Sequence, residues 1–263
     1  MPQIPSTDRS WLALLNRTLQ NGHKVHTRGR TVFEVFAQQS CISMSSPLVM
    51  TPGRKLSHQF AAVEAEWIIT GDNRLSTLLP YAPTYAKFSD DGQTLHGAYG
   101  PKVAVQLDSV IQAFVKDPNT RQAVINIWRE NPPESRDIPC TLSVQWLLRD
   151  GILQCFDTMR SSDVWLGWPY DIFSFSMLSH YLALRLRAAG VKVDVLGYIT
   201  LTAASCHLYE DDRAKAMAVL GSLDPTPTFT MPNLGTFENP SAFIDWLHDL
   251  HTNPTAINNY IRA

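Results

Sequence analysis

Apolar residues in the N-terminal part of the chain recur with spacings that separate helices from strands. A Ser/Thr/Asp cap followed by apolar residues at helical spacing predicts a helix over residues 6–20. Residues 31–43 are rich in β-branched and apolar side chains, which predicts one or two strands. A second helix is expected over residues 57–70. Residues 73–102 contain several prolines and glycines, so this stretch is predicted to be a long irregular loop region with a functional role.

The second half of the chain groups its strands without a strict strand–helix alternation. The segments LSVQWLLRD and ILQCFDTMR are strand candidates joined by a turn at Asp150-Gly151, which predicts a hairpin. The other expected elements are a helix over 105–115, a strand in QAVINIW, a helix over 170–189, a strand over 191–205 and a helix over 211–220. From Pro225 the tail is broken by prolines and is expected to end in a short helix. This grouping predicts an α+β fold, a single domain over 1–263 with a large mixed sheet backed by helices.

The charge and the cysteine spacing exclude several classes of protein. The formal net charge is −2, so the chain has no general electrostatic hold on a nucleic-acid polymer. The sequence contains neither a membrane-length apolar run nor the apolar core of a signal peptide, so no membrane partner is expected and a cytoplasmic location is predicted. The four cysteines lack C-x-x-C spacing, so neither a metal site nor a redox pair is expected. One thiol is therefore available as a nucleophile.

Cys140 is the cysteine whose surroundings favour chemistry. It lies in the segment Ile-Pro-Cys-Thr, at the predicted start of a strand and after a polar, proline-rich stretch. A thiol at such an edge is accessible to a substrate, although a small buried residue is the more common reading of position alone. The downstream segment MRSSDVWLGWPYD, residues 159–171, adds an arginine, serines and aspartates where the next strand ends.

Six short motifs of the chain occur in the same order as in thymidylate synthases. They are Glu64-x-x-Trp67 with Gly71-Asp72, Tyr99-Gly100, Asp117-Pro118 with Arg121, Pro139-Cys140-Thr141, Arg160-Ser161-x-Asp163 with Gly167 and Pro169, and His207-Leu208-Tyr209. Each motif alone is weak, but together, from about residue 8 to 220, they resemble this family strongly. The resemblance implies a homodimer that associates through its sheet and shares its active sites. It also implies one-carbon transfer from 5,10-methylenetetrahydrofolate to a pyrimidine nucleoside monophosphate.

The resemblance further implies a covalent mechanism. Cys140 is expected to add as a thiolate to C6 of the pyrimidine, which makes C5 nucleophilic. Arg160 is the cation expected to keep the thiol ionised. Glu64, in the apolar context AAVEAEWII, is expected to lead an acid–base network with Tyr99 nearby. A solvated helix face is the alternative reading for this glutamate.

The nucleotide contacts follow from the same motifs. The expected phosphate ligands are Arg160 and Ser161, one of Arg28 and Arg30 in the loop HTRGRT, and Arg121 from the partner subunit. Gln122 stands where the family usually has a second arginine, which removes one phosphate contact. His207 and Tyr209, two residues apart on a strand and therefore on one face, are expected to bind the sugar 3′-hydroxyl.

The folate is expected to lie between one aromatic-rich turn and one loop. The residues concerned are Leu166, Gly167 and Tyr170, with Asp163 as a hydrogen-bond partner of the pterin, and Tyr85 and Phe88 where synthases carry tryptophans. The smaller rings of Tyr85 and Phe88 favour the entry of water. The C-terminal segment TNPTAINNYIRA does not match the synthase tail that seals the site, which favours the same outcome.

Asp171 stands where the family has the asparagine that reads the base. An asparagine amide matches the N3–H donor and O4 acceptor of uracil, whereas cytosine presents an N4 donor and an N3 acceptor. A carboxyl group accepts from N4 and shares a proton with N3, and burial raises the aspartate pKa enough to supply that proton. Helix capping before Ile172 is the alternative reading of Asp171. Together with Thr141 in place of the family histidine, Asp171 resembles the deoxycytidylate (dCMP) hydroxymethylase branch.

Several outcomes remain open after the common adduct. Addition of water gives hydroxymethyl-dCMP, the expected product, and hydride transfer from the folate gives methyl-dCMP. Activity on CMP, activity on dUMP and a non-catalytic nucleotide-binding relative are further alternatives. A cysteine hydrolase built on Cys140 and His207 lacks a supporting signature. The expected setting is bacterial or phage-infected cytoplasm, in DNA modification or secondary metabolism.

Overall fold

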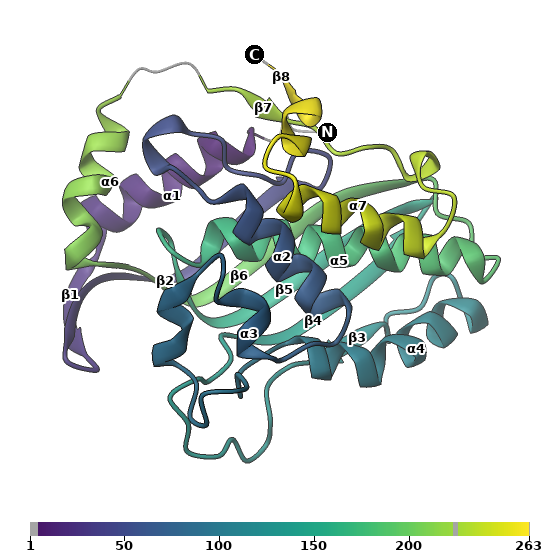
Figure 1. Ribbon diagram of the computed structural model, residues 1–263, viewed down its shortest axis with the longest axis horizontal. Coiled ribbons are helices and arrows are strands. Elements are labelled where there is room, and N and C mark those ends of the chain that lie inside the picture. The colour runs from purple at the N-terminus through teal and green to yellow at the C-terminus, as the bar shows by residue number, and fades with distance from the viewer. Residues whose placement is uncertain (1–4, 223–225, 263) are drawn as a thin grey trace.

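The protein, seen in a computed structural model that describes residues 5–222 and 226–262, is built around one mixed sheet (Figure 1). Six strands lie in the order β1-β2-β6-β5-β4-β3. β5 and β6 are parallel, and every other neighbouring pair in this sheet is antiparallel. The strands are β1 (His23–Thr27), β2 (Arg30–Ser43), β3 (Val124–Asn126), β4 (Thr141–Arg149), β5 (Ile152–Asp163) and β6 (Val195–Tyr209).

The hairpin of β4 and β5 positions much of the candidate site. Asp150 and Gly151 both have positive φ, at 51° and 76°, which is the backbone shape of a two-residue hairpin turn. Side chains alternate between buried and less buried positions along β4, as a half-covered sheet requires. The predicted hairpin is therefore confirmed, and its register places the end of β5 beside the start of β4.

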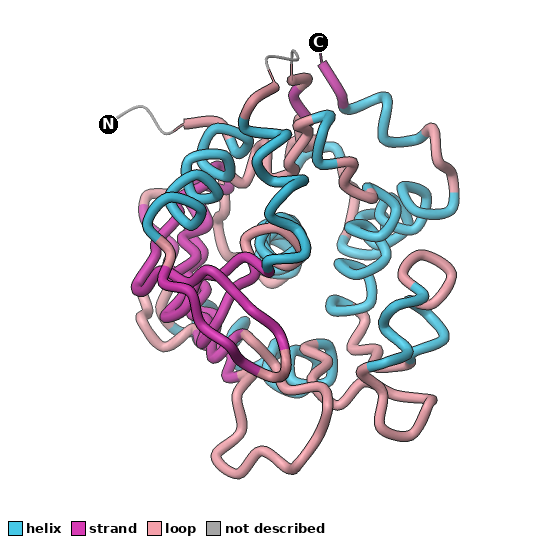
Figure 2. Tube along the Cα trace, turned by 90° about the vertical axis from the view of Figure 1, so that its left-hand side faces the viewer, coloured by secondary structure: helices cyan, strands magenta, loops and turns pink. Residues whose placement is uncertain are grey.

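Most helices gather on one side of the strands (Figure 2). α5 is buried along most of its length because it is apolar almost all round, and it packs between the sheet and α2, which in turn contacts α7. One hydrophobic cluster joins the helices and the inner face of the sheet. The helices are α1 (Thr7–Asn21), α2 (His58–Ile69), α3 (Leu75–Leu78), α4 (Gly100–Lys116), α5 (Trp168–Ala188), α6 (Arg213–Leu220) and α7 (Pro240–Thr252).

Several predicted elements are confirmed, with shifted ends. The first two expected helices are α1 and α2, and the side chains of Ser6 and Ser57 accept hydrogen bonds at their N-termini. Residues 31–43 form a single strand, and α4 begins earlier than expected because Pro101 is accommodated in the first turn of a helix. The long strand starts later, at Val195, and runs on to include Tyr209.

The C-terminal tail has a helix near its end, as expected, but holds more regular structure than the sequence indicated. α7 spans 13 residues, starts from an Asn239 cap with Pro240 in its first turn, and buries Phe243 and Leu247. Proline at a helix start is compatible with the helix, so the prolines delimit α7 rather than exclude it. Two short strands, β7 (Thr228–Phe229) and β8 (Ile261–Arg262), then pair with each other. Pro225, where the tail was expected to begin, lies outside the described residues.

Candidate active site

Cys140 lies immediately before β4, where the pairing with β5 brings it next to Arg160. The backbone N–H of Arg160 donates to the Cys140 carbonyl at 2.9 Å. The Cys140 Sγ atom is 3.7 Å from Nη2 of Arg160 and 3.7 Å from Oγ of Ser161. Burial raises the pKa of the Cys140 thiol, and the charge of Arg160 offsets only part of that rise. The expected effect of Arg160 on the thiol is therefore confirmed in direction, but in the free protein burial has the larger effect on the pKa of Cys140.

Arg160 also organises the turn that precedes the cysteine. Its Nε donates to the Pro139 carbonyl at 2.9 Å, and Nη2 donates to the Ile138 carbonyl at 3.0 Å. Its Nη1 donates to Oγ of Ser161 at 3.3 Å. A guanidinium group carries five N–H donors, so these bonds leave capacity for a further anionic acceptor. Arg160 and Ser161 lie within β5, which continues to Asp163, rather than at its end as predicted.

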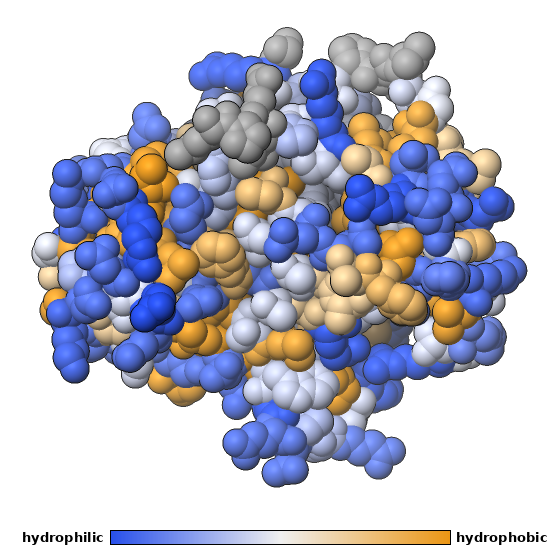
Figure 3. Space-filling view, turned by 180° about the vertical axis from the view of Figure 1, so that it is seen from behind, coloured by the Kyte–Doolittle hydropathy of each residue, from blue (hydrophilic) through white to orange (hydrophobic). Residues whose placement is uncertain are grey.

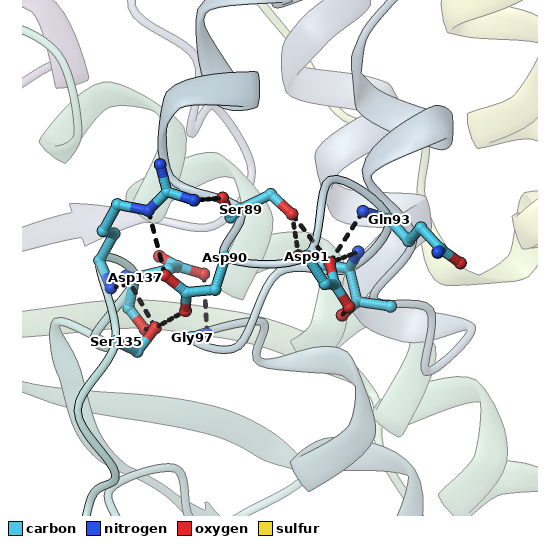
Figure 4. Close-up of polar contacts among 9 residues, drawn as sticks. Ser89, Asp90, Asp91, Gln93, Gly97, Ser135 and Asp137 are labelled. Carbon is cyan, nitrogen blue, oxygen red and sulfur yellow. Dashed lines mark hydrogen bonds and ion pairs between the residues drawn. The ribbon is translucent and has the colours of Figure 1, made fainter.

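The loop leading to Cys140 is tied to the loop that follows the short helix at Pro83–Lys87 (Figure 4). The Asp137 carboxylate accepts a hydrogen bond from the backbone N–H of Gly97 at 2.7 Å. Oγ of Ser135 donates to Asp90 at 2.5 Å, and Arg136 forms an ion pair with the same aspartate. These bonds connect two irregular segments and so restrict the position of the loop that carries Cys140.

Glu64, on α2, is the central acid–base candidate. Its two carboxylate oxygens accept hydrogen bonds from the hydroxyl of Tyr85 at 3.0 Å and from Oγ of Ser174 at 3.3 Å. Burial raises the pKa of Glu64 to about 7, although both hydrogen bonds lower it. Tyr99 lies near the cysteine, where its hydroxyl accepts a hydrogen bond from the backbone N–H of Thr141 at 3.4 Å. The solvated-face reading of Glu64 is wrong, because this carboxyl group points inward.

Asp171 lies inside the first turn of α5 and does not cap it. The helix begins at Trp168, and the backbone N–H of Asp171 already donates to the Gly167 carbonyl at 3.0 Å. Within the described residues, the half-buried Asp171 carboxyl group makes no hydrogen bond. Burial, followed by the charges of Asp157 and Glu64, raises the pKa of Asp171 well above its usual range. The capping alternative is therefore wrong, and the expected rise in pKa is confirmed in direction.

Asp157 is a residue of this cluster that the sequence motifs did not identify. It lies on β5 at an inward position between Cys155 and Met159, and only 1% of its surface is exposed. Neither of its carboxylate oxygens, nor the hydroxyl of Thr141, has a hydrogen-bond partner among the described residues. Burial raises the pKa of Asp157 well above its usual range, and the proximity of the Thr141 hydroxyl reduces that effect. The sequence offered one signal for this residue: a charged side chain at a strand position whose neighbours two residues away are apolar.

The strand register brings the sugar candidates beside this cluster. Asp163 on β5 is the register partner of His207 on β6, and the rings of His207 and Tyr209 lie edge to face with centroids 5.4 Å apart. Burial lowers the pKa of His207, while the nearby Asp163 raises it. The two side chains share one face of β6, as predicted.

Arg30 and Arg121 have different environments. Arg30 forms an ion pair of 2.8 Å with Asp211, and its guanidinium group lies 3.6 Å from the centre of the Tyr209 ring. Arg121 is exposed, and its carbonyl accepts a hydrogen bond from the Gln145 side chain. The described contacts of Arg121 do not join it to Cys140 within one subunit.

Arg28 occupies the tip of the β1–β2 hairpin, with a positive φ of 50°. It lines an open hollow of about 470 Å³ together with Lys87, Phe88, Ser135 and Arg136. Within the described residues, Arg28 makes no hydrogen bond or ion pair. The hollow thus presents three cationic side chains to the solvent.

The motif order and this geometry agree with a comparison against known families. A family model described as thymidylate synthase matches residues 9–261, nearly the whole chain. The chain belongs to the thymidylate synthase family. Membership implies folate-dependent one-carbon transfer to C5 of a pyrimidine nucleoside monophosphate, with methylenetetrahydrofolate as the donor. The expected α+β fold with a large mixed sheet is confirmed.

In this thymidylate synthase family chain, four of the residues expected to hold folate lie around the start of α5, namely Asp163, Leu166, Gly167 and Tyr170. Oδ1 of Asp163 accepts the backbone N–H groups of Trp165 and Leu166, each at 2.9 Å, which fixes the turn. The Leu166 side chain is 46% exposed, and the hydroxyl of Tyr170 accepts a hydrogen bond from the backbone N–H of Ser57. Gly167 is the N-cap residue of α5.

Arg54 is a second residue that the motifs missed. Its Nε donates to the Trp165 carbonyl at 3.0 Å, and its guanidinium group lies 4.9 Å from the Trp165 ring and 6.0 Å from the Tyr170 ring. Burial lowers the pKa of Arg54, and the nearby Tyr170 and Asp163 raise it. A cation beside an exposed leucine and a tyrosine suits a ligand that has both a flat ring and carboxylates.

The C-terminal segment has contacts of its own. The ring of Tyr260 lies 5.5 Å from that of Trp246 and 6.4 Å from that of Phe229. These contacts belong to α7 and β7 rather than to the residues around Cys140. Among the described residues, no helix is long and apolar enough to span a membrane.

Proposed function

We propose that the protein transfers a one-carbon unit from 5,10-methylenetetrahydrofolate to C5 of dCMP, with 5-hydroxymethyl-dCMP as the product. The observation that carries the proposal is Asp171, a carboxyl group without a hydrogen-bond partner among the described residues, at the family's base-reading position, where burial raises its pKa and so favours the protonated form. A neutral carboxyl group accepts N4–H of cytosine through one oxygen and donates its proton to N3 through the other. Uracil already carries a hydrogen on N3 and cannot take up that proton there, so only cytosine is activated by the transfer from Asp171.

Cys140 supplies the nucleophile in this reaction. The thiol first releases its proton to solvent, and the thiolate sulfur then bonds to C6 while the electrons of the C5–C6 double bond shift toward N3, which takes up the proton of Asp171. The positive charge of Arg160, with Nη2 at 3.7 Å from Sγ, favours the thiolate. Donation of a proton to N3 by Asp171 withdraws electrons from C6 and assists the attack.

Glu64 is the group proposed to move protons at C5. With a pKa of about 7 it is present in both protonation states at neutral pH, which suits a general base that removes the C5 proton. The hydroxyl of Tyr85 holds one carboxylate oxygen in place. Tyr85 is a smaller ring than the tryptophan expected there in synthases, and a smaller ring favours access of water to the methylene group, hence a hydroxymethyl product.

The phosphate is proposed to bind between Arg160, Ser161 and Arg28. Arg160 retains one N–H donor, on Nη1, that makes no bond among the described residues, and Arg28 makes no hydrogen bond or ion pair there at the tip of its hairpin. Arg30, already paired with Asp211, is proposed to support the Tyr209 ring beside the sugar. His207 and Tyr209 would bind the 3′-hydroxyl.

A homodimer is proposed to complete the phosphate site with Arg121 from the partner subunit. Seen from behind, the molecule carries hydrophobic residues among hydrophilic ones (Figure 3). Phe36 on β2 is 60% exposed, an unusual position for a large aromatic side chain in a monomer. Association through the sheet would cover this ring.

The folate is proposed to lie on Leu166, Gly167 and Tyr170, where it supplies the carbon that C5 takes up. Asp163 would bind the pterin, and Arg54 would bind the carboxylates of the glutamate. Phe88, 37% exposed next to Tyr85, would border the entrance.

Mass spectrometry of the nucleotide after incubation with methylenetetrahydrofolate tests the proposal, with dCMP, dUMP and CMP in parallel reactions. The proposal predicts hydroxymethyl-dCMP and tetrahydrofolate. Methyl-dCMP together with dihydrofolate would retain the cytosine assignment and replace the product. Turnover of dUMP alone would overturn the assignment of the base, and turnover of CMP in preference to dCMP would overturn that of the sugar.

A further inference from the structure

A cluster of metal-ligand side chains lies between α2 and α7, outside the nucleotide site. It consists of Glu66 on α2 with His248 and His251, which are three residues apart on α7 and so lie on one face. Nε2 of His251 is 2.5 Å from one oxygen of Glu66, and Nδ1 of His248 is 3.4 Å from the other. The three ligand atoms all lie within 4.8 Å of one another.

We propose that these three side chains bind a divalent transition-metal ion of the zinc class. Two imidazoles and a carboxylate, with a solvent position left open, are ligands that Zn²⁺ accepts in tetrahedral geometry, at about 2.0–2.2 Å from each ligand atom. The ion would replace the proton that His251 and Glu66 share. His248 has a 60% exposed side chain, so the site is open to solvent for ion entry and for a water ligand.

The surroundings of His251 match those of a metal-bound histidine. Its other ring nitrogen, Nδ1, lies 2.8 Å from the hydroxyl of Tyr81, and this partner fixes the ring orientation. The side chain of Gln59 donates to the His251 carbonyl at 2.8 Å, which holds the end of α7 against α2. Glu64, two residues before Glu66, points instead to Tyr85 and Ser174. The ion would therefore join α7 to the helix that carries the acid–base group without entering the site.

Calorimetric titration of the metal-stripped, full-length protein with Zn²⁺ tests this site. The proposal predicts one equivalent bound with submicromolar affinity and a raised Tm. In His251→Gln the affinity falls at least tenfold, in His248→Gln it also falls, and in His26→Gln, an exposed control on β1, it does not change. Failure to bind Zn²⁺, or equal affinity in His251→Gln, would overturn the proposal. Circular dichroism of each variant separates loss of the site from loss of the fold.

A second inference rests on the proposed function and concerns the buried carboxyl group of Asp157. Both of its oxygens and the hydroxyl of Thr141 lack hydrogen-bond partners among the described residues. Buried polar groups are almost always satisfied, so three such atoms near one another indicate a ligand that completes them. Thr141 follows the nucleophile Cys140 directly, and the charge of Asp157 raises the pKa of Asp171, so both groups lie near the base-reading position.

We infer that Thr141 and Asp157 form a polar subsite for the exocyclic amino group of cytosine. This amino group has two hydrogens, and Asp171 accepts only one of them. The second would reach the Thr141 hydroxyl, directly or through one water, and the hydroxyl would in turn bond to Asp157. The O4 atom of uracil has no hydrogen to offer, so the subsite would increase the preference for cytosine.

Steady-state kinetics of Asp157→Val and Thr141→Val on dCMP and dUMP test this subsite. The inference predicts that kcat/KM for dCMP falls at least tenfold relative to that for dUMP. Cys155→Val, an inward neighbour on the same strand, is the packing control and should alter both substrates equally. An unchanged ratio in both Asp157→Val and Thr141→Val would overturn the subsite. Absence of dCMP turnover in the wild type would instead overturn the proposed function, so the two failures are distinguishable.

Discussion

The hydroxyl of Tyr85 donates a hydrogen bond of 3.0 Å to Oε1 of Glu64, which joins the short 3-10 helix at Pro83–Lys87 to a buried glutamate on α2. A hydrogen bond to a carboxylate favours its ionised form, whereas burial favours the neutral form. In Glu64 burial has the larger effect, and the resulting pKa of about 7 lies close to neutral pH. The short 3-10 helix therefore adjusts the pH range in which Glu64 can act as a base.

Tyr85→Phe should raise the pKa of Glu64 further, because the variant removes a bond that stabilises the carboxylate. If the ionised form removes the C5 proton, the acidic limb of the kcat/KM profile should move to higher pH by about one half to one unit. The measurement is the pH profile for dCMP, with Tyr81→Phe as a control whose hydroxyl bonds to His251 instead. An acidic limb that stays in place would show that the bond does not tune Glu64.

Cys140→Ser should abolish covalent trapping by a 5-fluorinated deoxycytidylate in the presence of methylenetetrahydrofolate. A hydroxyl is a far weaker nucleophile than a thiolate, so turnover should fall by about a thousandfold or more. Intact-protein mass spectrometry detects the adduct. Cys41→Ser, which changes an exposed thiol, should form it normally. An adduct in Cys140→Ser would assign the nucleophile to another residue.

Arg28→Gln should raise KM for dCMP about ten- to a hundredfold, the effect of losing a charge-assisted bond to phosphate. Arg30→Gln should have the smaller effect, because Arg30 is already paired with Asp211. Comparison of KM for dCMP with that for the unphosphorylated nucleoside isolates the phosphate contribution. If Arg30→Gln had the larger effect on the phosphate contribution, Arg30 would be the phosphate ligand instead of Arg28.

The motifs predicted which residues form the site, but not the pKa values of those residues. Short sequences anchored by Cys140, Arg160 and His207 specified residues that the strand register does bring together. The effect of burial on the pKa of Cys140 could not be predicted, because it depends on how α5 and the preceding loop exclude water. The first and last residues of helices and strands could not be predicted from the sequence either where tertiary packing determines them.

Two residues were missed because they lie outside the familiar motifs. Arg54 enters the site only through the fold, which places the end of a short 3-10 helix beside Trp165 and Tyr170. Asp157 sits in an otherwise apolar inward row on β5, and a single strand does not reveal that α5 covers this row. The prolines of the tail were taken as breaks in regular structure, but Pro240 starts a helix that packs on α2.

Asp157→Val should stabilise the ligand-free protein at pH 7. The pKa of Asp157 is higher in the folded protein than in the unfolded chain. At a pH between these two pKa values, only the unfolded chain releases the proton. The free energy of unfolding therefore falls as pH rises above about 4, and the variant removes this loss. A gain of about 1–3 kcal/mol at pH 7, with a smaller gain at pH 3, is expected from removing an unsatisfied buried group.

Urea denaturation at the two pH values measures this difference, with Cys155→Val as the control on the same strand. If Asp157→Val destabilised the protein at pH 7, the Asp157 carboxyl group would have hydrogen-bond partners in the folded protein, which would contradict this prediction.

The most direct test of the central claim, that Asp171 selects cytosine, is the ratio of kcat/KM for dCMP to that for dUMP in the wild type and in Asp171→Asn. A carboxyl group can transfer its proton to N3, which an amide cannot do, and an amide turned with its oxygen toward N3–H and its N–H toward O4 fits uracil. The account predicts a wild-type ratio above one that falls at least a hundredfold in the variant, about 3 kcal/mol of discrimination. A ratio that stays the same in Asp171→Asn would contradict it.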